Sequence, residues 1–96
     1  MAGVITGRFI YWVDPASWVK GKGHRVSIVV EGERGHYPTG SADKEPWWWG
    51  DRQDEARSLE LAEQTALEAN TRRGFTEEQV MQILMSSMRG QRRVRR

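Results

Sequence analysis

The sequence has 96 residues, the size of one small domain, and its lack of cysteine excludes disulfides, thiolate zinc sites and cysteine nucleophiles. No apolar run approaches the roughly 20 residues of a membrane span, and the N-terminus lacks the basic start and apolar core of a signal peptide, so we expect a soluble cytoplasmic protein. The net charge of +2 is unevenly distributed, because residues 89–96 hold five arginines and no acid. Residues 1–88 contain 10 basic and 13 acidic side chains, so this part of the chain lacks the positive charge expected of a domain that binds nucleic acid over its surface.

The first forty residues have the composition of β-strands. Alternating apolar and polar side chains over residues 25–31 predict a half-buried strand with Val26, Ile28 and Val30 on its apolar face. Residues 4–13 are rich in β-branched and aromatic side chains and form the expected pairing strand. A third short strand is expected at residues 36–37. Two prolines and two glycines in residues 38–50 predict a long ordered loop.

Residues 52–72 are predicted to form a helix, because they contain neither glycine nor proline. Asp51 is the expected N-cap. The face expected to pack against the sheet is mostly alanine and consists of Ala56, Leu59, Ala62, Ala66, Leu67 and Asn70. A buried Asn70 needs a hydrogen-bond partner, which we expect in the turn at residues 73–76 or in the tryptophan-containing loop.

A second helix is predicted over residues 77–88, where the start signal is unusually complete. Thr76 as N-cap and Gln79 as the third helical residue fit a capping box, and Gly90 is expected to end the helix. These elements predict an α+β fold. An antiparallel β-hairpin or three-stranded sheet in the N-terminal half would be covered by a C-terminal two-helix hairpin.

Three consecutive tryptophans are the most informative feature of the chain. Neighbouring side chains point in different directions, so three in a row cannot all enter one small core. At least one should lie at a boundary, although the sequence does not indicate which. Either the tryptophans fill the gap between sheet and helices, or they form a recognition surface, because tryptophan is enriched at binding hot spots. The residues expected to bind a protein partner are Trp47, Trp48, Trp49, Tyr37 and Trp18.

Nucleic acid is the alternative partner. Aromatic and basic side chains lie near each other in the first half, a combination typical of platforms for single strands, and an arginine-rich segment can bind phosphates. The residues expected to serve this function are Arg89, Arg92, Arg93, Arg95, Arg96, Lys20, Lys22 and Arg25. The same arginines also fit a solvated segment, or one that docks on the acidic face of the first helix. We expect a single domain over residues 1–88 and a flexible tail over residues 89–96.

Catalytic and metal-binding signatures are missing from the sequence. The two histidines, His24 and His36, have no metal-site spacing and are expected at the surface. The glycines match no phosphate-binding loop, and no serine lies in a nucleophile motif. We therefore expect no enzymatic activity, no cofactor and no metal.

The order of motifs along the chain resembles that of a group of small proteins. The segments concerned are residues 31–40, Pro46–Gly50, the helix with Ala62, Ala66 and Asn70, the turn Arg73–Thr76 and the helix ending Ser86–Met88. Over about residues 24–88 the chain resembles small uncharacterised proteins of tailed phages that infect actinobacteria. The resemblance implies expression in the cytoplasm of a bacterial host and implies no activity.

The expected function is that of a non-enzymatic phage accessory factor. It would bind a host or phage protein stoichiometrically through an exposed aromatic loop. The alternatives are a nucleic-acid-binding protein and a small virion or assembly component. The methionine-rich face of helix 77–88 is a second expected contact and could pair two copies as a homodimer.

Overall fold

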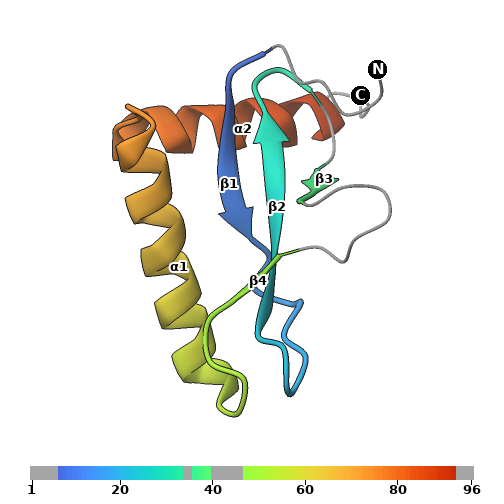
Figure 1. The fold of residues 1–96 in the computed structure, drawn as a ribbon. Coiled ribbons are helices and arrows are strands. Elements are labelled where there is room, and N and C mark those ends of the chain that lie inside the picture. The colour runs from blue at the N-terminus through green and yellow to red at the C-terminus, as the bar shows by residue number, and fades with distance from the viewer. Residues whose placement is uncertain (1–6, 34–35, 40–46, 93–96) are drawn as a thin grey trace.

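The computed structural model describes residues 7–33, 36–39 and 47–92. Its elements in chain order are β1 (Phe9–Val13), β2 (His24–Val30), β3 (Tyr37–Pro38), β4 (Trp48–Trp49), α1 (Glu55–Arg72) and α2 (Glu77–Arg92). The strands form an antiparallel sheet of order β1-β2-β3, with β4 also paired to β2, and both helices contact the sheet (Figure 1). The predicted α+β fold is confirmed. Parts of three predicted segments, at residues 4–6, 40–46 and 93–96, lie outside the described residues.

β2 is the central strand and is buried on both faces. It pairs with β1 in a register that sets Phe9 opposite Val30 and Val13 opposite Val26. Val26 and Val30 are buried on one face as predicted, but Val29 on the other face is also fully buried. The prediction of a half-buried strand is wrong because α2 packs against the Val29 face.

β3 and β4 follow one another along the second edge of β2, and Thr39 joins them. The Thr39 hydroxyl group donates to the Val26 carbonyl group at 3.1 Å and accepts from the Trp47 N–H at 2.8 Å. The predicted loop over residues 38–50 therefore contains a short strand. Its partners lie on β2, far away in the sequence, and so leave no local signal.

α1 is capped by Asp54, not by Asp51. The Asp54 side chain accepts a hydrogen bond from the Arg57 N–H at 3.1 Å. Asp51 instead accepts from the N–H groups of Gln53 and Asp54, and these bonds lower the pKa of its carboxyl group. Asp51 thus closes a turn before the helix, which begins at Glu55 and not at residue 52. The buried side of α1 is a row of small residues at four-residue spacing: Ser58, Ala62, Ala66 and Asn70.

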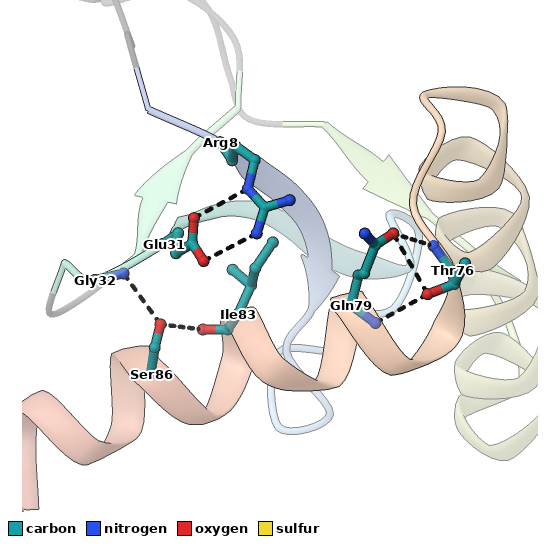
Figure 2. Close-up of polar contacts among 7 residues, drawn as sticks. All are labelled: Arg8, Glu31, Gly32, Thr76, Gln79, Ile83 and Ser86. Carbon is teal, nitrogen blue, oxygen red and sulfur yellow. Dashed lines mark hydrogen bonds and ion pairs between the residues drawn. The ribbon is translucent and has the colours of Figure 1, made fainter.

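α2 begins with the predicted capping box. The Thr76 hydroxyl group accepts from the Gln79 N–H at 3.1 Å, and the Gln79 side-chain oxygen accepts from the Thr76 N–H at 2.9 Å (Figure 2). The helix continues to Arg92, so the predicted end at Gly90 is wrong. A glycine inside a helix costs about 1 kcal/mol relative to alanine, which weakens the helix without ending it.

The two helices diverge from the turn that joins them. α1 runs along β1, whereas α2 crosses behind one face of the sheet (Figure 1). Two buried clusters result. Ile83 of α2 packs with Ile10 and Val29. On α1, Ala62 and Ala66 pack with Val13 and with the half-buried Trp49 and Leu59. β1 contributes to both clusters and so connects them.

Candidate functional site

Aromatic side chains gather on the sheet face that α2 does not cover. The rings of Trp47 and Trp49 stack with centroids 6.3 Å apart, and each lies about 6 Å from the Tyr11 ring, at 5.9 and 6.0 Å. Tyr11 and Tyr37 both pair with Ile28, from opposite sides, so the two tyrosines share one face of the sheet. We call Tyr11, Tyr37, Trp47 and Trp49 the aromatic surface.

The two stacked tryptophans have different surroundings. Trp49 packs against the cluster of Val13, Ala62 and Ala66 and fills space between the sheet and α1. Trp47 leaves 45% of its surface exposed, and Tyr37 leaves 44%. Trp49 therefore fits the interpretation as a residue that fills the gap between sheet and helices, whereas Trp47 is the tryptophan at the boundary. The sequence alone could not assign them, because the assignment depends on where α1 lies.

Charged groups border the aromatic surface on two sides. The Arg73 guanidinium group lies over the Phe9 ring at 3.9 Å and near the Tyr11 ring at 5.8 Å. On the other side the Tyr37 hydroxyl group donates to the Glu33 carboxylate at 2.6 Å. This hydrogen bond raises the pKa of Tyr37 above its usual value. The surface thus joins apolar area with one cation and one anion at its rim.

Trp48 points to the opposite face, as the alternation of a strand requires. Its ring lies under the Lys22 ammonium group at 5.2 Å and the Arg25 guanidinium group at 5.6 Å. We call Lys22, Arg25 and Trp48 the basic patch. Lys20 is exposed in the preceding turn. The structure therefore separates the three consecutive tryptophans into two groups on opposite faces.

Trp18 has a different role from the other predicted partner-binding residues. Its indole N–H donates to the Asp51 carbonyl oxygen at 3.0 Å, and the side chain is half-buried. This bond ties the turn before β2 to the segment before α1. Among the predicted tail residues, Arg89 and Arg92 lie within α2, while Arg93, Arg95 and Arg96 lie outside the described residues.

Asn70 binds β1, which the sequence analysis did not predict. Its carboxamide oxygen accepts from the Tyr11 N–H at 2.9 Å, and its nitrogen donates to the Tyr11 carbonyl oxygen at 3.1 Å. The predicted partners, the turn at residues 73–76 and the tryptophan loop, are wrong for the Asn70 side chain. The prediction that it needs a hydrogen-bond partner is correct, since the residue is 2% exposed.

The two histidines lie in unrelated environments. His24 is fully buried, and its Nδ1 lies 2.7 Å from the Ser58 hydroxyl oxygen of α1, so the expected surface position is wrong for this residue. His36 is exposed, with its ring 4.3 Å from the Trp12 ring. Within the described residues, no three His, Asp or Glu side chains lie close enough together to hold a metal ion. Ser58, which sequence reasoning missed, could have been noticed by its four-residue spacing from Ala62.

No protein family, curated protein or solved structure matches this chain. Neither of the two helices in the described part is long and apolar enough to cross a membrane. Function has therefore to be inferred from the geometry of the chain itself.

Proposed function

We propose that this protein is a non-enzymatic binding protein that holds a protein partner on the aromatic surface. The supporting observation is that Trp47, beside Tyr11 and Trp49, leaves 45% of its surface exposed. A large apolar side chain thus faces water. Tryptophan and tyrosine anchors of this kind dominate the energies of protein interfaces. In line with the resemblance to phage proteins, the partner would be a host or phage protein in the bacterial cytoplasm.

The rigidity of Trp47 also supports this function. Its carbonyl group accepts from the Val26 N–H at 3.1 Å, and its N–H donates to the Thr39 hydroxyl group. Its ring is stacked on Trp49, which is held against α1. A side chain that is fixed before binding loses little conformational entropy when a partner covers it, so more of the contact energy becomes affinity. Arg73 and Glu33 at the rim would orient the partner by charge.

The test is affinity capture from an actinobacterial lysate, with Trp47→Ala compared with Met85→Ala. The control is matched, because Met85 is an exposed apolar residue of α2, at 48%, away from the aromatic surface. We expect Trp47→Ala to remove a stoichiometric protein partner and Met85→Ala to keep it. A partner retained equally by both variants at moderate salt would contradict this function, and so would the absence of any stoichiometric partner.

Nucleic-acid binding is the second candidate, and the basic patch favours it. Lys22 and Arg25 over the Trp48 ring combine a stacking surface with two cations, which is the chemistry of single-strand binding. Titration of tryptophan fluorescence with single-stranded DNA and RNA at two salt concentrations separates the candidates. Phosphate contacts should give quenching that weakens steeply with salt and is reduced by Arg25→Ala. Quenching that Arg25→Ala leaves unchanged would exclude the basic patch as the site.

A further inference from the structure

A groove lies between the two helices, and Tyr11 is the one residue that its lining shares with the aromatic surface. It has a volume of about 310 Å³ and is floored by β1. Its apolar lining includes Trp12, Ala66, Leu67, Val80, Met81 and Leu84. Met81 is 56% exposed and Leu67 is 40% exposed, so apolar side chains face water here without a covering element among the described residues.

The charges at the groove are all negative. Glu63 of α1 and Glu77 of α2 are the charged residues of its lining, one from each helix, and both are exposed. An apolar floor between two carboxylates fits a segment that presents an apolar side chain flanked by cations. Arginine fits such a site especially well, because the methylene groups of its side chain are apolar and its guanidinium group can form two parallel hydrogen bonds to a carboxylate.

The chain contains one segment with this pattern. Arg92-Arg93-Val94-Arg95-Arg96 places a single apolar residue between two pairs of arginines. The groove volume suits a few side chains, not a large ligand. Charge and size therefore select this segment among the sequences that the chain itself offers.

The position of the groove favours a segment from a second molecule. Val94 follows Arg92, the last residue of α2, by two residues, which span at most about 7 Å. Met81 lies eleven residues before Arg92 in the helix, or about 16 Å, so the middle of the groove is more than twice that span away. A segment from another copy is free of this constraint.

We infer that the groove between α1 and α2 binds the segment Arg92–Arg96 of a second copy of this chain. Val94 enters between Leu67 and Met81, and the flanking arginines pair with Glu63 and Glu77. Because the donor and acceptor surfaces differ, two copies either exchange these segments reciprocally or continue head to tail. This contact involves neither Trp47 nor Tyr37, the exposed residues of the aromatic surface, so its failure would leave the proposed function untouched.

Charge exchange between two variants tests this contact. Glu63→Lys with Glu77→Lys reverses the groove, and Arg93→Glu with Arg95→Glu reverses the segment. Sedimentation velocity of the full chain at low salt should show concentration-dependent association above the 11.1 kDa monomer. Each double variant alone should associate at least tenfold more weakly, which is about 1.4 kcal/mol. An equimolar mixture of the two should recover association, because each reversed surface meets its complement in the other chain.

The matched control is Glu68→Lys with Glu78→Lys. It makes the same change in net charge, with one site on α1 and one in the first turn of α2, at exposed residues outside the groove lining. We expect it to associate like the unmodified chain. Three results would overturn the inference: a monomer at the highest soluble concentration, a mixture that fails to associate, or association that disappears once bound nucleic acid is removed. Circular dichroism confirms that each variant is folded.

Discussion

Asn70 takes the place of a neighbouring strand at the outer edge of β1. Its carboxamide group offers one acceptor and one donor to Tyr11, the same pair that a strand would offer. The Arg73 guanidinium group donates to the carbonyl oxygen of Phe9, which lies two residues before Tyr11 in β1. Side chains of α1 and of its C-terminal cap thus satisfy an edge that would otherwise be a template for aggregation.

Asn70→Ala should lower the free energy of unfolding by about 2 kcal/mol. The variant leaves the Tyr11 N–H and carbonyl groups without their partners in a half-buried position, and each such group costs about 1–3 kcal/mol when water cannot replace the bond. Urea unfolding measures the change. Gln64→Ala is the control, because it lies on the exposed side of the same helix. Equal stability of the two variants would mean that water satisfies the edge of β1.

Tyr37 should ionise at higher pH than an ordinary tyrosine, whose pKa is near 10.0. The hydrogen bond to Glu33 stabilises the neutral hydroxyl group, and the nearby carboxylate opposes the phenolate. This contribution to stability is therefore present below the usual pKa and is lost as pH rises through the raised one. Ultraviolet titration of the chain, minus that of Tyr37→Phe, isolates this group. Glu33→Gln should bring the titration back toward the usual range, and an unchanged midpoint would argue against the bond in solution.

Among the elements, β4 and α1 depend on each other through close backbone contact. A Cβ at Gly50 would overlap the hydroxyl and carbonyl oxygens of Ser58, so only glycine lets the strand approach the helix. The same Ser58 hydroxyl group binds His24 from β2. Gly50 therefore completes a junction of two strands and one helix around a single small side chain.

Gly50→Ala should destabilise the fold by about 2 kcal/mol more than Gly74→Ala. Both glycines have a left-handed backbone, with φ of 102° and 97°, so alanine is strained by about 1–2 kcal/mol at each. Only Gly50 has atoms in the way, and overpacking of this kind typically costs about 1–3 kcal/mol. Chemical denaturation of both variants gives the difference. Equal losses would show that the β4–α1 junction relaxes around the added methyl group.

Local signals could be predicted from the sequence, whereas contacts between distant segments could not. The capping box at Thr76 and Gln79 involves residues three positions apart, and it forms as predicted. Asp51 and Asp54 are both good caps by residue type, and only the turn that precedes the helix decides between them. The partner of Asn70 and the division of the tryptophans onto two faces depend on how α1 lies along β1. No spacing within one element encodes that arrangement.

Across the whole molecule, β1 connects two clusters that the diverging helices would otherwise keep apart. Ile10 faces the α2 cluster, whereas Val13 faces the α1 cluster. The Ser86 hydroxyl group, which accepts from the Gly32 N–H at 3.0 Å, holds α2 to the turn after β2 (Figure 2). The Arg8–Glu31 ion pair at 3.0 Å closes the same end of the β1–β2 hairpin. Because β1 belongs to both clusters, disrupting either cluster should destabilise the other, and the domain should unfold as one unit.

Ile83→Val should therefore destabilise α1 and α2 equally, although Ile83 belongs to α2. Loss of one buried methylene group costs about 0.5–1.5 kcal/mol, and β1 should pass this cost to the cluster around Ala62. Nuclear magnetic resonance peaks of α1 and α2 amides, followed through urea unfolding, should shift to the same lower midpoint. Met85→Ala on the exposed side of α2 should move neither set. A midpoint that falls for α2 alone would mean that this helix detaches while β1 and α1 stay folded, and that the clusters are energetically separate.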